Sequence, residues 1–311
     1  MSWGTLLEEL AEPHRPLRAS HLARLSDLTP ARQGELARLW PRIETPRRRR
    51  IVERLVEMSE EDLVLDFSPV FLLALEDPDA DVRTLAVRGL WGDERRQVLQ
   101  RLLAVLESDP EPQVRAEAAL ALGNFVRRYS VGHLRERHFR PIESALRRAI
   151  ESPDEAEEVR ARALEAIGYC ADRAWVREAI RTAFESGRHR LRVSALQAMG
   201  RSGESRWLPL LLRELSSDDP ELRYEAAAAC GAIGDEAAVP HLAPLLQDED
   251  EEVREAAIAA LGEIGGREAR ELLLPLLEDQ TPAIRAAAEA ALAELEFGED
   301  PFSLRSFLDE R

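Results

Sequence analysis

Histidine and cysteine are the side chains that most often carry metal chemistry or nucleophilic catalysis, and this chain has few of them. Of the six His, only His133 and His138 are close in sequence, and their spacing fits neither one helix face nor a zinc pair. Cys170 and Cys230 are far apart, and the sequence contains no Cys-x-x-Cys pair and no Gly-rich phosphate loop. We therefore expect no catalytic residues, no metal ligands and no cofactor, and a protein that is not an enzyme.

A recurring arginine organises most of the chain. Each copy follows a branched apolar residue, and Ala stands three positions after it, a small residue six after and a larger apolar residue seven after. These offsets share one stripe of a helix, so we expect that face to be buried. The seven copies, at intervals of 32, 45, 32, 31, 31 and 31 residues, are Arg83, Arg115, Arg160, Arg192, Arg223, Arg254 and Arg285. A period of this length is typical of stacked helical repeats.

Other columns of the repeat predict how this helix begins and ends. N-cap residues stand four positions before the Arg in four copies: Asp79, Asp219, Asp250 and Thr281. Six positions before it, Asp recurs in five copies and Ser in two, which predicts charge-assisted hydrogen bonds between repeats. A glycine eight positions after the Arg, at 123, 168, 200, 231 and 262, is interpreted as the point where the helix loosens towards its end.

A second apolar helix precedes each of these, for example at 239–246 and 271–277. Paired helices with an Asp-Pro turn, followed by Val-Arg and Ala-rich turns, resemble the HEAT repeat. The bacterial PBS-lyase-type HEAT-like form is the most similar, over about residues 69–296. The resemblance implies an all-α fold, an α-solenoid of stacked two-helix repeats in an α-α superhelix, because one hairpin cannot bury its apolar face alone.

The two ends of the chain depart from the repeat. Residues 1–68 predict an irregular helical N-terminal cap made of two degenerate repeats, with helices starting at Thr29-Pro30 and Thr45-Pro46. Residues 297–311 form a C-terminal tail, which we expect to cap the last repeat; docking on another protein is the alternative. The apolar residues of that tail are Phe302, Leu304, Phe307 and Leu308.

Charge is unevenly distributed along the sequence. Residues 1–150 carry 24 Arg and 24 acidic residues, whereas residues 151–311 carry 18 Arg and 35 acidic residues and give the whole net charge of −17. The C-terminal part would therefore repel phosphates and anionic membranes. No apolar run is long enough to span a bilayer and no signal peptide opens the chain, so we expect a cytoplasmic protein with reduced cysteines.

With no catalytic set, the exposed surface is the candidate for function. The resemblance implies that the second helix of each hairpin lines the concave side, with positions one, five and nine after the Arg facing outwards. We predict that this surface makes the chain a non-enzymatic scaffold for a basic or neutral protein or peptide. The predicted partner-binding residues are Tyr169, Arg201, Tyr224, Arg162, Glu255 and Glu263.

Two other functions stay open. A nucleic-acid-binding or repair protein would use Arg47 to Arg50, unless that run is a solvated helix start, and an insertion near 126–140 that lies in a stretch of net charge +5. We expect the insertion to be a longer connection or a binding loop. The residues of this alternative are Arg47, Arg48, Arg49, Arg50, Arg127, Arg128, Arg135 and Arg137.

The second open alternative is an accessory or chaperone protein similar to phycobilin lyases, which share this repeat type. HEAT-like deoxyhypusine hydroxylases are also related by resemblance, and they bind iron through His-Glu dipeptides. No His-Glu dipeptide occurs in this sequence, so we do not expect that activity.

Overall fold

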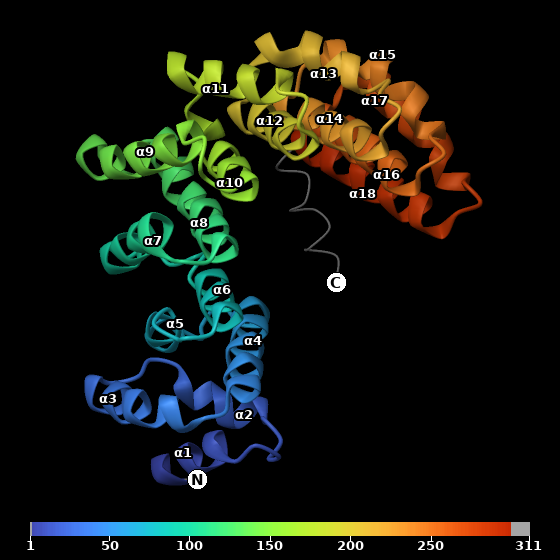
Figure 1. The fold of residues 1–311 in the computed structure, drawn as a ribbon. Helices are drawn as coiled ribbons and strands as arrows, with labels where there is room; N and C mark the ends of the chain where they lie inside the picture. Colours follow the sequence, from blue (N-terminus) through green and yellow to red (C-terminus); the bar gives the residue numbers. More distant parts are fainter. Residues whose placement is uncertain (1, 300–311) are drawn as a thin grey trace. The chain divides into compact units, whose positions relative to one another are not determined.

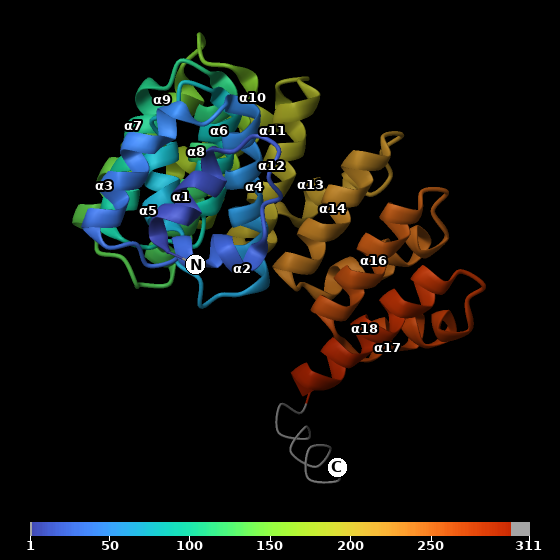
Figure 2. The same ribbon diagram turned by 90° about the horizontal axis from the view of Figure 1, so that it is seen from below.

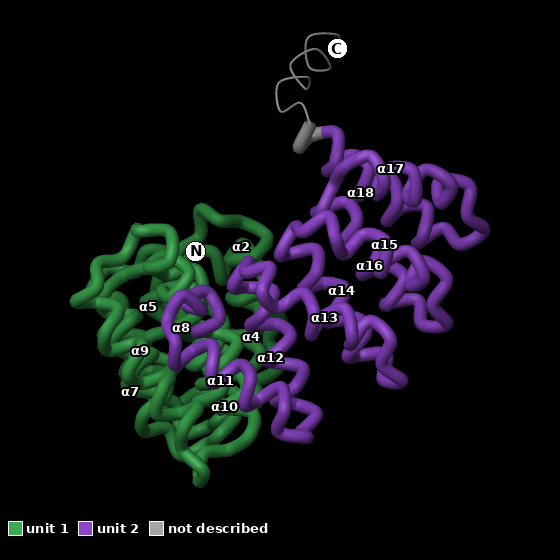
Figure 3. The backbone as a smooth tube through the Cα atoms, turned by 90° about the horizontal axis from the view of Figure 1, so that it is seen from above, with its two compact units in different colours: residues 1–166 green, residues 167–311 purple. Residues whose placement is uncertain are grey.

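The computed structural model describes residues 2–299, with side chains through residue 296, and in this range it contains helices and no strand. The chain divides into two compact units, residues 1–166 and residues 167–311 (Figure 3). The prediction of an all-α repeat fold is confirmed. Of the predicted tail, 297–311, residues 297–299 continue the last helix, and residues 300–311 lie outside the described residues.

Unit 1 contains two layers of helices (Figure 1). The first helices of its hairpins are α1 (Trp3–Ala11), α3 (Pro30–Leu39), α5 (Ser68–Ala74), α7 (Arg96–Ser108) and α9 (Glu136–Glu151). The second helices are α2 (Ala19–Leu22) continued by η1 (Ala23–Leu25), α4 (Thr45–Glu61), α6 (Ala80–Gly89), α8 (Pro112–Ser130) and α10 (Glu157–Ile167), and the short η2 (Trp40–Arg42) follows α3. Second helices pack on one another in order, α4 on α6 and α6 on α8.

Unit 2 repeats this plan after η3 (Gly168–Cys170), and Figure 2 shows its second helices following one another. Its second helices are α12 (His189–Ser202), α14 (Pro220–Ile233), α16 (Glu251–Ile264) and α18 (Pro282–Glu299). Its first helices are α11 (Ala174–Glu185), η4 (Ser205–Trp207) with α13 (Leu208–Glu214), η5 (Glu236–Ala238) with α15 (Val239–Leu242) and η6 (Ala243–Gln247), and α17 (Gly266–Leu273) with η7 (Leu274–Glu278).

Proline explains why the last first-layer helices tighten into 3₁₀ turns. Pro244 and Pro275 stand at the second positions of η6 and η7. A proline has no N–H for the bond to the carbonyl four residues earlier, and its ring crowds that carbonyl. The regular α-helix therefore ends at these points.

The predicted buried columns are confirmed. The Ala three positions after each Arg is completely buried in all seven copies: Ala86, Ala118, Ala163, Ala195, Ala226, Ala257 and Ala288. The N-cap prediction is confirmed for Asp79, Asp219 and Asp250, whose carboxylates accept from backbone N–H groups of the first turn. Helix α3 starts at Pro30 as predicted, whereas α4 starts one residue early, at Thr45 with Glu44 before it.

The Arg column does link repeats, with local changes of partner. Arg83 reaches Asp109 and Arg223 reaches Asp248, each through two bonds of 2.7 to 2.9 Å. In the second copy, Arg115 pairs with Glu155 instead of the predicted Asp154. Most of these arginines also donate to the backbone carbonyl six residues earlier, as Arg254 does to Asp248 at 2.7 Å. The Arg column therefore stabilises both the turn between the two helices of its own repeat and the contact with the neighbouring repeat.

The predicted loosening is seen at Gly168, where α10 gives way to η3, but the glycine column also has a role that was not predicted. A Cβ on Gly200 would lie 2.9 Å from Cα of Ala229, and the same clash recurs between Gly231 and Ala260. The helices continue beyond these glycines, and α12 ends at Gly203, which has φ of +63°. The column therefore lets successive second helices pack at short distance, and a different glycine terminates the helix.

The insertion is also different from the loop that we predicted. Its residues lengthen α8 and α9, so that only residues 131–135 connect the two helices. The rings of Tyr129 and Phe139 stack across this connection with centroids 3.8 Å apart, and the Tyr129 hydroxyl donates to Glu136. Extra helical turns bury more apolar surface than a loop of the same length, as the buried Phe139 shows.

Candidate functional site

The surface that best matches the predicted binding residues is the exposed side of η3, α12, α14, α16 and α18, called here the second-helix face of unit 2. Arg201 of α12 lies with its guanidinium carbon 5.9 Å from the ring centroid of Tyr169. Tyr224 of α14 is 40% exposed. Tyr169 thus lies near a cation, whereas Tyr224 is presented to solvent.

Carboxylates follow these residues along the same face. Glu255 and Glu263 of α16 are exposed. The Glu263 side chain lies across the neighbouring helix, because a Cβ on Gly231 would meet its Oε2 atom at 2.6 Å. Burial against that helix and the nearby Glu294 carboxylate raise the pKa of Glu263 above its ordinary value. The face therefore carries negative charge that its own side chains do not neutralise.

Small side chains separate the aromatic and acidic groups. Ala228 and Ala232 of α14, Ala259 of α16 and Ala290 of α18 are all exposed. A methyl group covers little of the helix backbone, so a bound segment can approach these helices closely. The combination is an apolar floor with a tyrosine at one end and carboxylates along its length.

The predicted outward stripe is wrong for the earlier repeats. One position after the Arg, Thr84, Ala116, Ala161 and Val193 are buried, and only the last three copies expose this column. Glu165, five positions after Arg160, is completely buried beneath Arg162. In this repeat the Arg162 side chain folds back over its own helix and lies against Glu165.

Arg162 does not join the other predicted partner-binding residues. It belongs to unit 1, where its guanidinium group pairs with Glu158 at 2.9 Å and Glu165 at 3.0 Å. Both partners lie on its own helix, at spacings of four and three residues. We therefore leave Arg162 out of the candidate site.

The run from Arg47 to Arg50 is neither solvated throughout nor a free anion site. Arg47 is 1% exposed, and it donates to four backbone carbonyls of residues 9–15 at 2.8 to 3.3 Å. Arg48 is buried against Asp77 with bonds of 2.6 and 3.1 Å, and Arg49 pairs with Asp79 and Asp81. Arg50 donates to the Pro13 carbonyl. The run thus joins the irregular N-terminal repeats to the next repeat.

The arginines of the insertion are more accessible. Arg127, Arg135 and Arg137 are exposed, whereas Arg128 is half-buried and pairs with Glu94 at 2.8 Å. Arg127 donates to the Asn124 side chain at 3.2 Å, and Arg137 contacts His138. This region therefore offers guanidinium groups to solvent, in unit 1.

Three further features of the described residues concern metal ligands, membrane-spanning helices and cysteines. Between residues 2 and 299, no three His, Cys, Asp or Glu side chains gather in a way that could hold a metal ion. None of the helices described is long and apolar enough to cross a membrane. Cys170 and Cys230 are buried, and burial raises the pKa of Cys230 to about 12.

Unit 1 also contains a cavity that no sequence pattern had predicted. This cavity of about 590 Å³ lies beside Trp91, which is 45% exposed. Trp91 stands eight positions after Arg83, where five other copies have glycine. In the sequence, the signal for this cavity was therefore a tryptophan in a column that otherwise mostly has glycine.

The comparisons with known proteins agree with this architecture. A family profile described as HEAT repeats matches residues 68–138 and 208–293, which together make up half of the chain. Repeats of this class define an α-solenoid scaffold. The chain belongs to the HEAT-repeat family. No protein of curated function matches it in sequence.

Solved structures show likeness in fold. The complex of CpcE and CpcF of phycocyanin lyase from Nostoc sp. PCC7120 is 20% identical, over 74% of this chain and 93% of that chain, with a TM-score of 0.48. YibA of E. coli is 19% identical, over 78% and 95%, with a TM-score of 0.45. Human deoxyhypusine hydroxylase in complex with glycerol is 19% identical, over 94% and 96%, with a TM-score of 0.36.

Proposed function

We propose that the chain is a non-enzymatic cytoplasmic scaffold that binds a basic or neutral segment of another protein on the second-helix face of unit 2. The observation that carries the proposal is the 40% exposure of Tyr224 on α14, and the Tyr169–Arg201 pair of η3 and α12 supports it. Tyrosine and arginine are the side chains most often responsible for binding energy at interfaces. A solvent-exposed tyrosine ring costs little conformational entropy when a partner covers it.

Charge determines which partners suit this face. Glu255 and Glu263 are exposed, and Glu263 is near Glu294, so an acidic segment would meet like charges. A basic segment would instead be attracted, and its association rate would rise at low salt. The exposed alanines allow the segment to lie close to the helices. We expect contacts along the floor and ion pairs at the carboxylates.

A peptide selection tests the proposal directly. A random peptide library displayed on phage would be selected on the full chain, and the best peptides would be titrated by fluorescence anisotropy. Replacing both Tyr169 and Tyr224 with Ala should weaken binding by about 2 kcal/mol or more, which is about 30-fold. Replacing Glu255 and Glu263 with Gln should lower affinity mainly at low salt.

A matched control uses the other layer. Glu268 and Glu278 are exposed acids of α17 and η7, and their change to Gln alters net charge equally without touching the face. If the Glu255/Glu263 and Glu268/Glu278 variants lost affinity equally, the effect would depend on net charge alone and not on the face. Undiminished binding by the tyrosine variant, for every selected peptide that does not depend on Trp91, would contradict the proposal.

A nucleic-acid-binding function is the second candidate, and it rests on the exposed Arg135 and Arg137 of unit 1. Exposed guanidinium groups are the usual contacts to phosphates. If a selected ligand or a single-stranded oligonucleotide loses affinity when both arginines become Ala, and not when the tyrosines change, this candidate gains support. A phycobilin-lyase-like role has only likeness in fold behind it, and fold alone does not assign that activity.

A further inference from the structure

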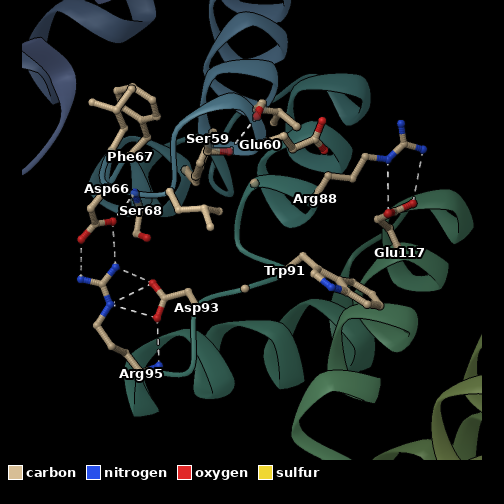
Figure 4. Close-up of a pocket in the computed structure, with 16 residues that line it drawn as sticks. Ser59, Glu60, Asp66, Phe67, Ser68, Arg88, Trp91, Asp93, Arg95 and Glu117 are labelled. Atoms are coloured by element: carbon tan, nitrogen blue, oxygen red, sulfur yellow. Dashed lines mark hydrogen bonds and ion pairs between the residues drawn. The ribbon is translucent and has the colours of Figure 1, made fainter. Parts of the chain in front are cut away.

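The cavity beside Trp91 is separate from the surface used by the proposed function, since every residue that lines it belongs to unit 1. It lies between the end of α4, residues 62–67, the end of α6 and the turn that follows (Figure 4). Its volume of about 590 Å³ falls within the range of pockets that bind ligands or side chains.

The floor of the cavity exists because one repeat has Gly instead of Ala in the small-residue column. Gly89 stands where six other copies have Ala, and a Cβ there would lie 2.4 Å from the Phe71 ring. Phe71 is buried and packs edge-on against Phe67, with ring centroids 6.4 Å apart. The glycine therefore leaves room for an aromatic floor.

Trp91 is held at the mouth of this cavity by polar contacts of its own turn. Its carbonyl accepts from the buried Asn124 of α8 at 3.1 Å. Further along the turn, Arg95 pairs with Asp93 at 2.5 Å and with Asp66 at 3.0 Å, as Figure 4 shows. The ring is thus presented to solvent from a fixed backbone, which lowers the entropy lost on binding.

An exposed apolar segment borders the cavity. Leu63 is 91% exposed and its neighbour Val64 is 85% exposed, the two highest values among the large apolar side chains of residues 2–296. Together with the half-exposed Trp91 they form a continuation of the cavity lining. Exposed apolar residues beside a preformed cavity are typical of sites for other proteins, because water is released when they are covered.

The charge of the lining is negative. It contains four carboxylates, Glu60, Asp66, Asp93 and Glu117, and two guanidinium groups, Arg88 and Arg95. Arg95 is paired with the two aspartates, and Arg88 pairs with Glu117 at 3.2 Å. Among the described residues, no ion pair to Glu60 is formed. A ligand with a cation beside its apolar part would complement this arrangement.

We propose that this Trp91 pocket binds an extended segment of a partner protein that carries a bulky apolar side chain next to Lys or Arg. The apolar side chain fills the cavity between Phe71 and Trp91, and the cation lies beside Glu60. The flanking backbone crosses Leu63 and Val64, an apolar border that a small ligand confined to the cavity would leave uncovered. A nucleic acid would meet the net negative lining unfavourably.

The test is a selection followed by variants of the full chain. A phage-displayed library of random peptides of about 12 residues, the length of one bound segment, would be selected on the wild-type chain. Phages that also bind the Trp91→Ser variant would be removed. We expect the enriched peptides to share Leu, Ile, Phe or Met within about two positions of Lys or Arg. Trp91→Ser and Leu63→Ser should each weaken a synthetic peptide of this set by about tenfold or more, and Glu60→Gln by a smaller factor that shrinks at high salt.

Matched variants keep the test decisive. Leu274→Ala removes a side chain of unit 2 that is 47% exposed, close to the value for Trp91, and it should leave the affinity unchanged. The Tyr169/Tyr224 double variant should also bind normally, which separates this site from the second-helix face. Leu63 is almost fully exposed, so Leu63→Ser keeps the test valid if Trp91→Ser fails to fold.

Three outcomes would overturn the proposal. The first is a selection without binders that depend on Trp91. The second is a set of enriched peptides without the apolar and basic pair. The third is binding that Trp91→Ser and Leu63→Ser leave within about twofold of wild type.

Discussion

Arg223 and Asp248 form a bidentate ion pair in which Nε and Nη2 each lie 2.7 Å from a carboxylate oxygen, and both side chains are about 10% exposed. The pair joins α14 to the turn before α16. We expect Arg223→Ala to lower the free energy of unfolding by about 3 kcal/mol, because it leaves a nearly buried carboxylate unpaired. Arg267→Ala is the control, since that side chain is 91% exposed and its loss should cost at most about 0.5 kcal/mol. Equal losses in urea titrations would contradict the role of the Arg column.

The same pair predicts a dependence of stability on pH. The hydrogen bonds from Arg223 hold the pKa of Asp248 below its ordinary value. A carboxyl group whose pKa is lowered on folding adds stability above its unfolded pKa, near 3.9 for Asp, and this stability is lost as the pH falls through the folded pKa. The melting temperatures of wild type and Arg223→Ala should therefore differ at about pH 6 and approach one another at about pH 3. A constant difference across this range would contradict the assignment.

The glycine column predicts opposite effects for two Gly→Ala changes. In Gly200→Ala the new methyl group would lie 2.9 Å from the backbone of Ala229, so we expect a loss of about 1–3 kcal/mol. Gly34 lies within α3 with no atom within 4 Å of the new methyl group. Gly34→Ala should stabilise the chain by about 0.5–1 kcal/mol through helix propensity. Thermal unfolding of both variants measures these changes in stability. If both substitutions were stabilising, α12 and α14 would be able to move apart without a loss of free energy of unfolding.

The buried alanine column predicts a second contrast, within one helix. Ala257 is completely buried, whereas Ala259 on the same helix is exposed. Ala257→Leu should overpack the contact of α16 with its neighbours and cost about 1–3 kcal/mol. Ala259→Leu should stay within about 0.5 kcal/mol of wild type. The midpoints of denaturant titrations measure both, and an unchanged midpoint for Ala257→Leu would show that the position can expand.

The N-terminal arginine run predicts a contrast between Arg47 and Arg50. Arg47→Ala removes the donor for four carbonyls of residues 9–15, and we expect it to cost about 2–4 kcal/mol and to loosen α1. Arg50 is exposed and donates one bond to Pro13, so Arg50→Ala should cost less than about 1 kcal/mol. Hydrogen exchange of the amides in residues 3–11 measures the loosening. Similar exchange in the two variants would place Arg47 outside the stabilising contacts.

Much of this fold was predictable from the repeat in the amino-acid sequence. The period of the repeat predicted paired helices, and the Ala column predicted the buried stripe, because a position that faces the neighbouring repeat in every copy keeps the same side-chain size. The caps at Asp79, Asp219 and Asp250 also followed from sequence, since an N-cap bond is made within one turn of the chain. Interactions within one helical turn and positions repeated in every copy can therefore be predicted from the sequence.

Tertiary structure decided whatever depends on contacts between repeats. The sequence placed Arg47 and Arg48 in solvent or on an anion, but the carbonyls of residues 9–15 and the Asp77 carboxylate bury them. The glycines were interpreted as points where the helix loosens towards its end, whereas their close packing against alanines of the next repeat was not predicted.

The candidate sites show the same limit. Tyr224 was predicted to face outwards and is exposed, although the same column is buried in the first four copies. The cavity beside Trp91 was not predicted, because it combines residues from α4, α6 and the turns between helices. Which side chains meet across those turns depends on how the hairpins stack, and no local pattern encodes that geometry.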